Sequence, residues 1–367
     1  MIWGAGIIAN QSRLALMLLL SVYSFVAITP SIAAESPDDR VSFSGDFRLR
    51  LEGIDRNQSD DVERARFRAR FAIKADIAED IQLIVRLATG GGNPVSTNQN
   101  FGDGFSVKDI GVDRAYVDWK INDTLRLFGG KMKNPYFRAG GNSLIWDSDL
   151  NPEGVVAAYK TDTVFGNLGL MVVNEGAGDD VLMVSAQAGF TVKLGGVAML
   201  TAGLGYFDYH GVAGVEPFFN GNAKGNSVDV DGNYRFDYTT VELYAELKSG
   251  FNDRPLTVYG EWTQNTEVSI EDTAYVIGVK LGSTGKMGNT EFGYAYHNTE
   301  ADALIGTFTE SDFAGGNTDS SGHFIKAKYV LRDRVVLGAT VIISEIGVFA
   351  GNERDYDRIM IDLEFKF

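Results

Sequence analysis

Charged and apolar residues alternate with a period of two over residues 64 to 75. Arginines stand at every second position, and small, aromatic or branched apolar side chains stand between them: Arg64, Arg66, Arg68 and Arg70 against Ala65, Phe67, Ala69, Phe71 and Ile73. On a helix these arginines would spread around the whole cylinder, whereas on a β-strand they form one row opposite the apolar side chains. The pattern therefore predicts a strand with one charged face and one apolar face.

The same alternation recurs from residue 41 to the end of the chain and predicts sixteen strands. Their expected ranges are 41–52, 62–76, 80–89, 110–121, 124–133, 152–161, 165–174, 180–193, 196–209, 235–248, 255–266, 271–282, 289–299, 321–332, 334–345 and 356–367. The 43 glycines and only 7 prolines suit a β-rich chain with many turns. We therefore expect an all-β fold, a transmembrane antiparallel up-and-down β-barrel of about 16 strands, since such bacterial barrels have an even strand number.

The connections between the predicted strands alternate between short and long. Short turns follow the even-numbered strands, for example at residues 122–123 and 195–196, and long Gly-, Asn- and Asp-rich loops follow odd-numbered strands at 90–109, 134–151, 210–234 and 300–320. Outer-membrane barrels have short periplasmic turns and longer extracellular loops, whereas a soluble β-sandwich has no reason to segregate its loops in this way. The loop lengths therefore support a membrane barrel.

The two faces of the predicted strands differ in the sense that a membrane barrel requires. In residues 242–248 one face carries Leu243, Ala245 and Leu247, and the other carries Glu242, Tyr244, Glu246 and Lys248. The apolar faces extend over about ten residues, which is what a tilted strand needs to cross a bilayer. A water-soluble barrel would place its apolar side chains inside. We therefore expect apolar side chains to face lipid and charged side chains to face a water-filled lumen.

The N-terminus has the pattern of a secretory signal peptide. Arg13 precedes an apolar run that continues to Ile28, and small residues follow at Ser31, Ala33 and Ala34. The run breaks at Pro30 and is not expected to be a transmembrane helix. The expected organisation is a signal peptide over residues 1–34 and a single outer-membrane barrel domain over residues 35–367.

Several functional classes are disfavoured by composition. The chain has no cysteine, which excludes disulfides, thiolate metal sites and thiol nucleophiles. Its formal net charge of −16 disfavours nucleic-acid binding. No nucleophile motif surrounds any serine that could act with the three histidines, His210, His297 and His323. We therefore expect no enzymatic activity, no catalytic or metal-binding residues and no cofactor.

Basic residues on the inward faces of the first five strands are the candidate lining of a pore. They are Arg48, Arg50, Arg64, Arg66, Arg68, Arg70, Lys74, Arg114 and Arg126, with Arg86 on the same face. An anhydrous interior could not hold such a row, because unpaired charges are costly away from water. The alternative is a plugged barrel in which the arginines form a structural network with carboxylates at Asp46, Glu52, Asp113 and Asp118.

Three segments and the C-terminus resemble the putative-porin family of Gram-negative outer membranes, which is similar in style to the phosphate-selective porins. The segments are residues 114–119 (Arg-Ala-Tyr-Val-Asp-Trp), 129–135 (Gly-Gly-Lys-Met-Lys-Asn-Pro) and 146–154 (Trp-Asp-Ser-Asp-Leu-Asn-Pro-Glu-Gly). The alternating C-terminal stretch ends on Phe367, as the closing strands of outer-membrane barrels do. The chain lacks a lysine-rich inward loop, so phosphate selectivity is not expected.

This resemblance implies a sixteen-stranded channel for passive diffusion of small hydrophilic solutes or ions. It also implies a third extracellular loop that folds inward and carries Asp147, Asp149 and Glu153 to face the wall arginines. The expected partners are outer-membrane lipid, lipopolysaccharide, the barrel-assembly machinery acting through Phe367, and further copies of the chain in a homotrimer.

Two alternatives remain open, an outer-membrane lipid hydrolase and a structural or adhesive barrel with a blocked lumen. For a channel, the wall arginines favour anions and the negative total charge favours cations near the mouth. Salt screens charges beyond about 8 Å, so local lumen charge is expected to dominate and to favour anions or dipolar solutes.

Overall fold

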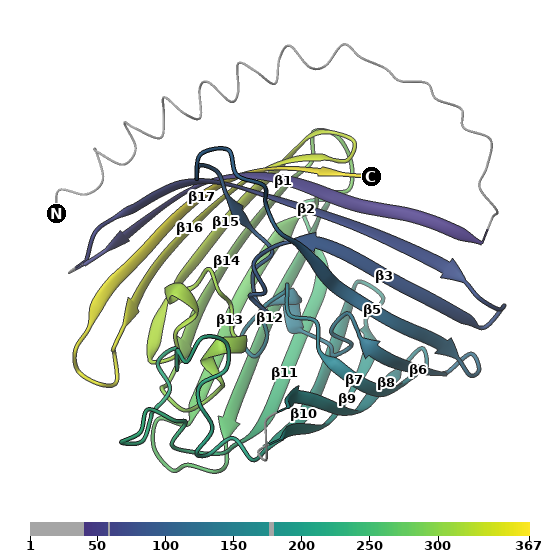
Figure 1. The fold of residues 1–367 in the computed structure, drawn as a ribbon. Coiled ribbons are helices and arrows are strands. Elements are labelled where there is room, and N and C mark those ends of the chain that lie inside the picture. Colours follow the sequence, from purple (N-terminus) through teal and green to yellow (C-terminus); the bar gives the residue numbers. More distant parts are fainter. Residues whose placement is uncertain (1–39, 58, 176–179) are drawn as a thin grey trace.

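The computed structural model describes residues 40–57, 59–175 and 180–367, and these form one antiparallel sheet that closes on itself (Figure 1). Sixteen long strands and one two-residue strand make up the sheet. They are β1 (Val41–Arg56), β2 (Val62–Asp76), β3 (Ile81–Thr89), β4 (Gln99–Asn100), β5 (Ile110–Lys120), β6 (Leu125–Lys131), β7 (Glu153–Lys160), β8 (Val164–Asn174), β9 (Val181–Leu194), β10 (Ala198–His210), β11 (Tyr238–Phe251), β12 (Arg254–Asn265), β13 (Thr273–Gly282), β14 (Thr290–Thr299), β15 (Ser320–Arg332), β16 (Val335–Ile346) and β17 (Arg354–Lys366). All sixteen predicted strands are present, and the predicted fold class is confirmed.

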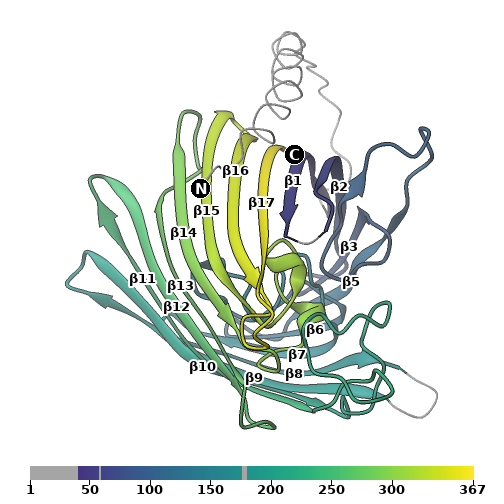
Figure 2. The same ribbon diagram turned by 90° about the vertical axis from the view of Figure 1, so that its left-hand side faces the viewer.

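The first and last strands complete the barrel. β17 lies beside β1 (Figure 2), with Asp46 opposite Lys366 and Arg56 opposite Tyr356. Gly45 and Phe367 exchange two backbone hydrogen bonds of 3.1 Å at the end of this seam. Closure pairs the backbone groups of both terminal strands, as a membrane-spanning sheet requires.

The C-terminal aromatic side chain fits into the outer surface of this seam. The ring centroid of Phe367 lies 6.3 Å from that of Phe71 on β2, which is 5.8 Å from that of Phe43 on β1. A Cβ atom at position 45 would lie 2.5 Å from the Phe367 ring, so only glycine leaves room for it there. The closing strand thus ends in a group of three aromatic side chains on the outside of the barrel.

Side chains alternate between the two faces as predicted. Leu168, Leu243 and Ile277 project outward with 65%, 55% and 60% of their surface exposed in the isolated barrel. Their inward neighbours, such as Glu242, are buried inside the barrel. The apolar side chains therefore form the outer surface and the charged ones line the interior.

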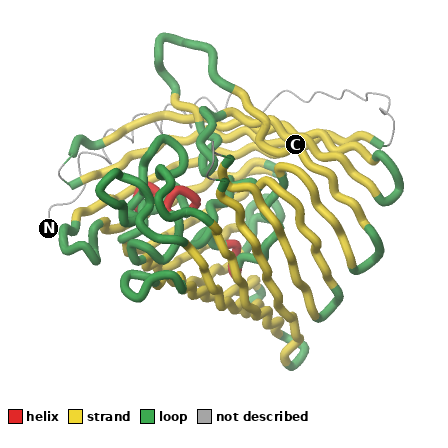
Figure 3. The backbone as a smooth tube through the Cα atoms, turned by 60° about the horizontal axis from the view of Figure 1, so that its bottom comes forward, coloured by secondary structure: helices red, strands yellow, loops and turns green. Residues whose placement is uncertain are grey.

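Four long loops leave the barrel at the end opposite Val41 and Phe367, and parts of them gather in its interior (Figure 3). We name them loop 2 (residues 90–109, which includes β4), loop 3 (132–152), loop 5 (211–237) and loop 7 (300–319). Their helical turns are η1 (Ala139–Gly141) in loop 3, and η2 (Gly306–Phe308) and η3 (Ala314–Gly316) in loop 7. In the part of the chain that the structure describes, no helix is long and apolar enough to cross a membrane.

Loop 2 divides between the inside and the outside of the barrel at β4. β3 pairs with β2 only between Arg70 and Asp76. Nearer the start of β2, β4 takes the place of β3, and Gln99 lies opposite Phe67. Val95 and Thr97, before β4, are buried in the interior. After β4, the ring of Phe101 stacks on that of Phe67 at 5.5 Å, and Phe105 is fully exposed.

Candidate pore lining and inward loops

The inward faces of β1, β2 and β17 form a charged surface that we call the arginine wall. The β1–β2 register places Arg48 opposite Arg68 and Arg50 opposite Arg66. Across the seam, Arg50 lies opposite Asp362 of β17. Cross-strand neighbours on one face lie within reach of each other, so the alternation in each strand brings these charges into one surface.

Carboxylates on the same wall pair with most of the arginines. Asp46 lies 2.8 Å from Arg68 and 2.7 Å from Arg70. Arg50 donates two hydrogen bonds to Asp362, at 2.7 and 2.9 Å. The four carboxylates proposed for a structural network all have arginine partners in the structure, in the pairs Asp46 with Arg68 and Arg70, Glu52 with Arg64 and Arg66, Asp113 with Arg86, and Asp118 with Arg126.

Loop 3 crosses the interior and binds the wall opposite the arginines. The amide of Phe137 donates to Gln187 of β9 and that of Gly140 donates to Glu246 of β11, each at 2.7 Å. The side chain of Asn142 donates to Glu261 of β12 at 2.7 Å. Gly140 has a φ of +62°, and a Cβ atom there would lie 2.3 Å from the ring of Tyr259. This contact requires glycine both for its backbone angle and for its lack of a side chain.

The three acidic residues predicted to face the arginines have different surroundings. Asp149 lies 3.0 Å from Arg70 and 3.8 Å from Arg68. Burial alone would raise the pKa of Asp149, but Arg68 and Arg70 outweigh it and hold that pKa below its usual range. Asp147 instead accepts the backbone amide of Ser311 in loop 7 at 2.8 Å. Glu153 is exposed and pairs with Lys131 at 2.7 Å.

Loop 7 supplies an acidic contact that the sequence analysis missed. Asp312 lies 2.9 Å from Arg50 and 2.5 Å from Arg358 of β17, which was also missed. Burial would raise the pKa of Asp312, but these two arginines lower it far below its usual range. Two signals were available in the sequence. Arg358 has the same parity as Asp362, and loop 7 contains apolar residues that are unusual in a solvated loop, Ala303, Leu304, Ile305, Phe308 and Phe313.

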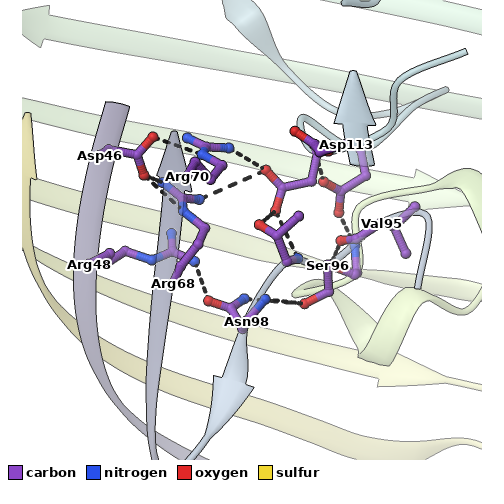
Figure 4. Close-up of polar contacts among 12 residues, drawn as sticks. Asp46, Arg48, Arg68, Arg70, Val95, Ser96, Asn98 and Asp113 are labelled. Atoms are coloured by element: carbon purple, nitrogen blue, oxygen red, sulfur yellow. Dashed lines mark hydrogen bonds and ion pairs between the residues drawn. The ribbon is translucent and has the colours of Figure 1, made fainter. Parts of the chain in front are cut away.

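Loop 2 approaches the wall between loops 3 and 7. Figure 4 shows Arg48, Arg68 and Arg70 extending from β1 and β2 toward this loop. Arg48 donates to Asn98 at 2.7 Å, and Thr97 Oγ1 lies 3.2 Å from Asp149. Loops 2, 3 and 7 therefore all reach the arginine wall.

The other predicted lining residues lie farther from this contact region. Arg114 donates to Asn151 of loop 3 at 2.7 Å, and Arg126 pairs with Asp118 at 2.9 Å. Lys74 is exposed near the turn end of β2.

Comparison of the sequence with known families gives a match over nearly all of the barrel. Residues 54–231 and 227–367 match the family described as "Putative porin". The chain belongs to this porin family. No curated protein sequence matches it significantly. The protein is therefore a channel-forming porin of the bacterial outer membrane, as the resemblance had indicated.

Solved structures share the architecture of this porin at low sequence identity. OprB of Pseudomonas putida is 13% identical, with a TM-score of 0.61 over 90% of this chain and 95% of the other. A triple mutant of the Rhodopseudomonas blastica porin is 14% identical, with a TM-score of 0.51 over 89% of this chain and all of the other. Both likenesses concern the fold.

Two cavities of the porin have Asp312 in their lining. The loop-side cavity has a volume of about 410 Å³, and its charged lining consists of Arg64, Arg66, Lys224, Arg358 and Asp312. The turn-side cavity has a volume of about 340 Å³, and its lining includes Arg48, Lys280, Lys326, Glu310 and Asp312. Asp312 therefore borders both cavities, with Arg50 lining the turn-side one and Arg358 lining the loop-side one.

Two of the three histidines of the porin lie against aromatic rings. His297 is buried, with its ring 5.1 Å from that of Phe313 and 5.8 Å from that of Phe324. His323 Nδ1 lies 2.9 Å from the hydroxyl of Tyr294. Among the described residues, no group of His, Cys, Asp and Glu could hold a metal ion.

Proposed function

We propose that this porin conducts small hydrophilic solutes and ions along its arginine wall, through a constriction made by loops 2, 3 and 7. The observation that carries this proposal is the pair of acidic contacts that loops make with the wall. Asp149 of loop 3 lies 3.0 Å from Arg70, and Asp312 of loop 7 lies 2.9 Å from Arg50. Together with the cavities on both sides of Asp312, these contacts support a narrow passage at mid-height.

These paired charges lie at the edge of the passage, since contacts of 3.0 and 2.9 Å leave no room for a solute between the partners. Carboxylates on the loop side and guanidinium groups on the wall side set up a transverse field, which orients dipolar solutes and sorts ions by sign. The arginines are paired but not all neutralised, because Arg48 lies 3.9 Å from Asp362 and shares that carboxylate with Arg50. This shortage of carboxylates supports a preference for anions and dipolar solutes.

The test of channel function is planar-bilayer recording on the purified, folded porin. We expect stepwise ion conductance, and a reversal potential in a salt gradient that indicates anion preference. Folded protein that gives no conductance above background would contradict the channel, while clear cation preference would contradict only the assigned selectivity. Deletion of residues 139–150 should raise the conductance, because it removes most of loop 3 from the lumen.

We infer further that the mature protein is a single barrel domain over residues 35–367, exported by a signal peptide over residues 1–34. Export would remove the signal peptide by cleavage near Ala33 or Ala34. Residues 1–34 lie outside the described residues. Mass spectrometry of the outer-membrane form would give a different N-terminus if this inference were wrong.

We also infer that the porin has no catalytic activity, which the aromatic packing of His297 supports. Lipid hydrolysis lost in a His297→Ala variant would contradict it.

We propose three kinds of partner. Membrane lipid and lipopolysaccharide would cover the apolar exterior, and the barrel-assembly machinery would act on the strand that ends at Phe367. Further copies of the chain would form a homotrimer, which is supported by the outward tip of loop 2, where Phe105 and Val107 expose essentially their whole side chains.

A further inference from the structure

We propose that the loop-side cavity is a binding site for small hydroxylated carboxylates, such as a sugar acid, which the porin holds before they pass Asp312. This inference rests on the proposed channel function and names a solute class for it. It concerns the cavity lined by Arg64, Arg66, Lys224 and Arg358, above the contact of Asp312 with the wall.

The cavity carries more positive than negative charge. Its lining has four cationic side chains, those of Arg64, Arg66, Lys224 and Arg358, and one carboxylate, that of Asp312. A second carboxylate, that of Glu52, contacts the arginines from outside the lining. Glu52 is fully buried and is shared by Arg64 at 2.6 Å and Arg66 at 3.3 Å. Asp312 is shared between Arg358 and Arg50, and Arg50 is also paired with Asp362. Two of the four lining cations therefore have no carboxylate of their own, and an anion that enters would supply the missing charge.

Two guanidinium nitrogens beside the cavity also lack hydrogen-bond partners, and Lys224 lacks a carboxylate partner among the described residues. The Nε atoms of Arg66 and Arg358 are buried and have no hydrogen-bond partner among the described residues, although Arg358 Nε lies 4.0 Å from Glu52 Oε1. Lys224 Nζ donates to the carbonyl of Gly315 at 3.1 Å and has no carboxylate within salt-bridge distance in the described chain. Burial and the charge of Arg358 both lower the pKa of Lys224, in keeping with a local excess of positive charge. The guanidinium groups of Arg64, Arg66 and Arg358 line the cavity, and such groups match the planar geometry of a carboxylate.

The remaining polar lining of the cavity is uncharged. It includes Asn93, Ser96, Asn220, Asn222, Thr307 and Tyr356. Amide and hydroxyl groups both donate and accept hydrogen bonds, so they suit the hydroxyl groups of a sugar acid. A volume of about 410 Å³ is sufficient for a six-carbon solute. The cavity thus offers cationic side chains for one carboxylate of a solute and uncharged polar side chains for its hydroxyl groups.

The experiment uses gluconate as the probe and glucose as its neutral match. In planar bilayers, gluconate added on the loop side should interrupt the chloride current at concentrations where glucose does not. Lys224→Gln and, separately, Arg66→Gln should weaken this block by roughly tenfold, since each removes one charge-assisted contact. Lys286→Gln, in an exposed turn at the other end of the barrel, removes the same charge and should leave the block unchanged.

Calorimetric titration of gluconate into the folded porin in detergent separates this inference from the channel proposal. Binding that is lost in Lys224→Gln supports the site even if the porin does not conduct. A conducting porin that neither binds gluconate nor responds to Lys224→Gln would overturn the site and leave the channel intact. Inorganic phosphate that binds as tightly as gluconate would overturn the assignment to hydroxylated carboxylates.

Discussion

Asp149 Oδ1 lies 3.0 Å from Nη1 of Arg70, although 79 residues separate the two along the chain. The contact joins the end of loop 3 to the inner face of β2. It brings together two groups that are distant in sequence, on the surface along which we expect solutes to pass.

Neutralising Asp312 should make the pore more selective for anions. Asp312→Asn removes the carboxylate that Arg50 and Arg358 share, so both arginines contribute more positive charge to the passage. We expect the anion-to-cation permeability ratio to rise roughly two- to threefold, and the stability to fall by at most about 3–5 kcal/mol. The ratio is measured from the reversal potential in a potassium chloride gradient. Asp231→Asn, in an exposed part of loop 5, is the matched control, and equal ratios in both variants would contradict the prediction.

Acidification should strengthen the contact between loops 3 and 7. Burial raises the pKa of Asp147 well above its usual 3.8, and the nearby Glu310 and Asp149 raise it further. A carboxyl group with a raised pKa in the folded state favours folding when protonated, and it loses this contribution as pH rises through that pKa. Asp149 acts in the opposite sense, but its lowered pKa keeps it charged across this range.

Hydrogen exchange measures this pH effect. We expect the amide protection of residues 144–151, corrected for intrinsic exchange, to be greater at about pH 5 than at about pH 7.5. Asp147→Asn imitates the protonated form and should remove the difference. Protection that falls with acidification in the unmodified porin would contradict the assignment.

Adding a methyl group at position 140 should release loop 3 from the opposite wall. Gly140→Ala costs about 1–2 kcal/mol for the left-handed backbone and also places Cβ against the ring of Tyr259. We expect higher or noisier single-channel conductance. Gly91→Ala is the matched control, because nothing lies within 4 Å of a Cβ atom there. Identical recordings from both variants would show that the contact at Gly140 does not control the pore.

Polar substitution at the tip of loop 2 should dissociate the proposed trimer. Phe105 and Val107 expose 104% and 98% of their surface, and their burial against a neighbour would contribute about 1.5–3 kcal/mol each. We expect Phe105→Ser with Val107→Ser to convert trimers to monomers in native mass spectrometry. Val230→Ser, at an equally exposed site in loop 5, should leave the trimer intact. A porin that is monomeric before any substitution would refute the trimer.

Removing the terminal aromatic ring should slow barrel assembly. Phe367→Ala takes away the ring that packs against Phe71 beside Gly45. We expect less folded porin in the outer membrane, measured as the heat-modifiable band in electrophoresis. Phe251→Ala removes an equally exposed ring at the turn end of β11 and should assemble normally. Equal yields would exclude a special role for the C-terminal ring.

The strands and their faces could be predicted because a strand repeats every two residues. The predicted range 62–76 coincides with β2, and the row from Arg64 to Arg70 lies on the inner face. The loops could not be predicted in the same detail, because their contacts join distant parts of the chain. The resemblance led us to expect Asp147, Asp149 and Glu153 opposite the arginines, but only tertiary structure shows that Asp147 meets loop 7 and that Asp312 contacts the wall.

Among the described residues, the carboxylate partners of Arg50 lie at the far end of the sequence, since Asp312 and Asp362 follow it by 262 and 312 residues. While the barrel is being built, Arg50 therefore carries a charge that loop 7 and β17 balance only late. An incomplete barrel is penalised electrostatically until β17 arrives, so the side chains that line the finished pore also favour correct ring closure over premature closure with fewer strands.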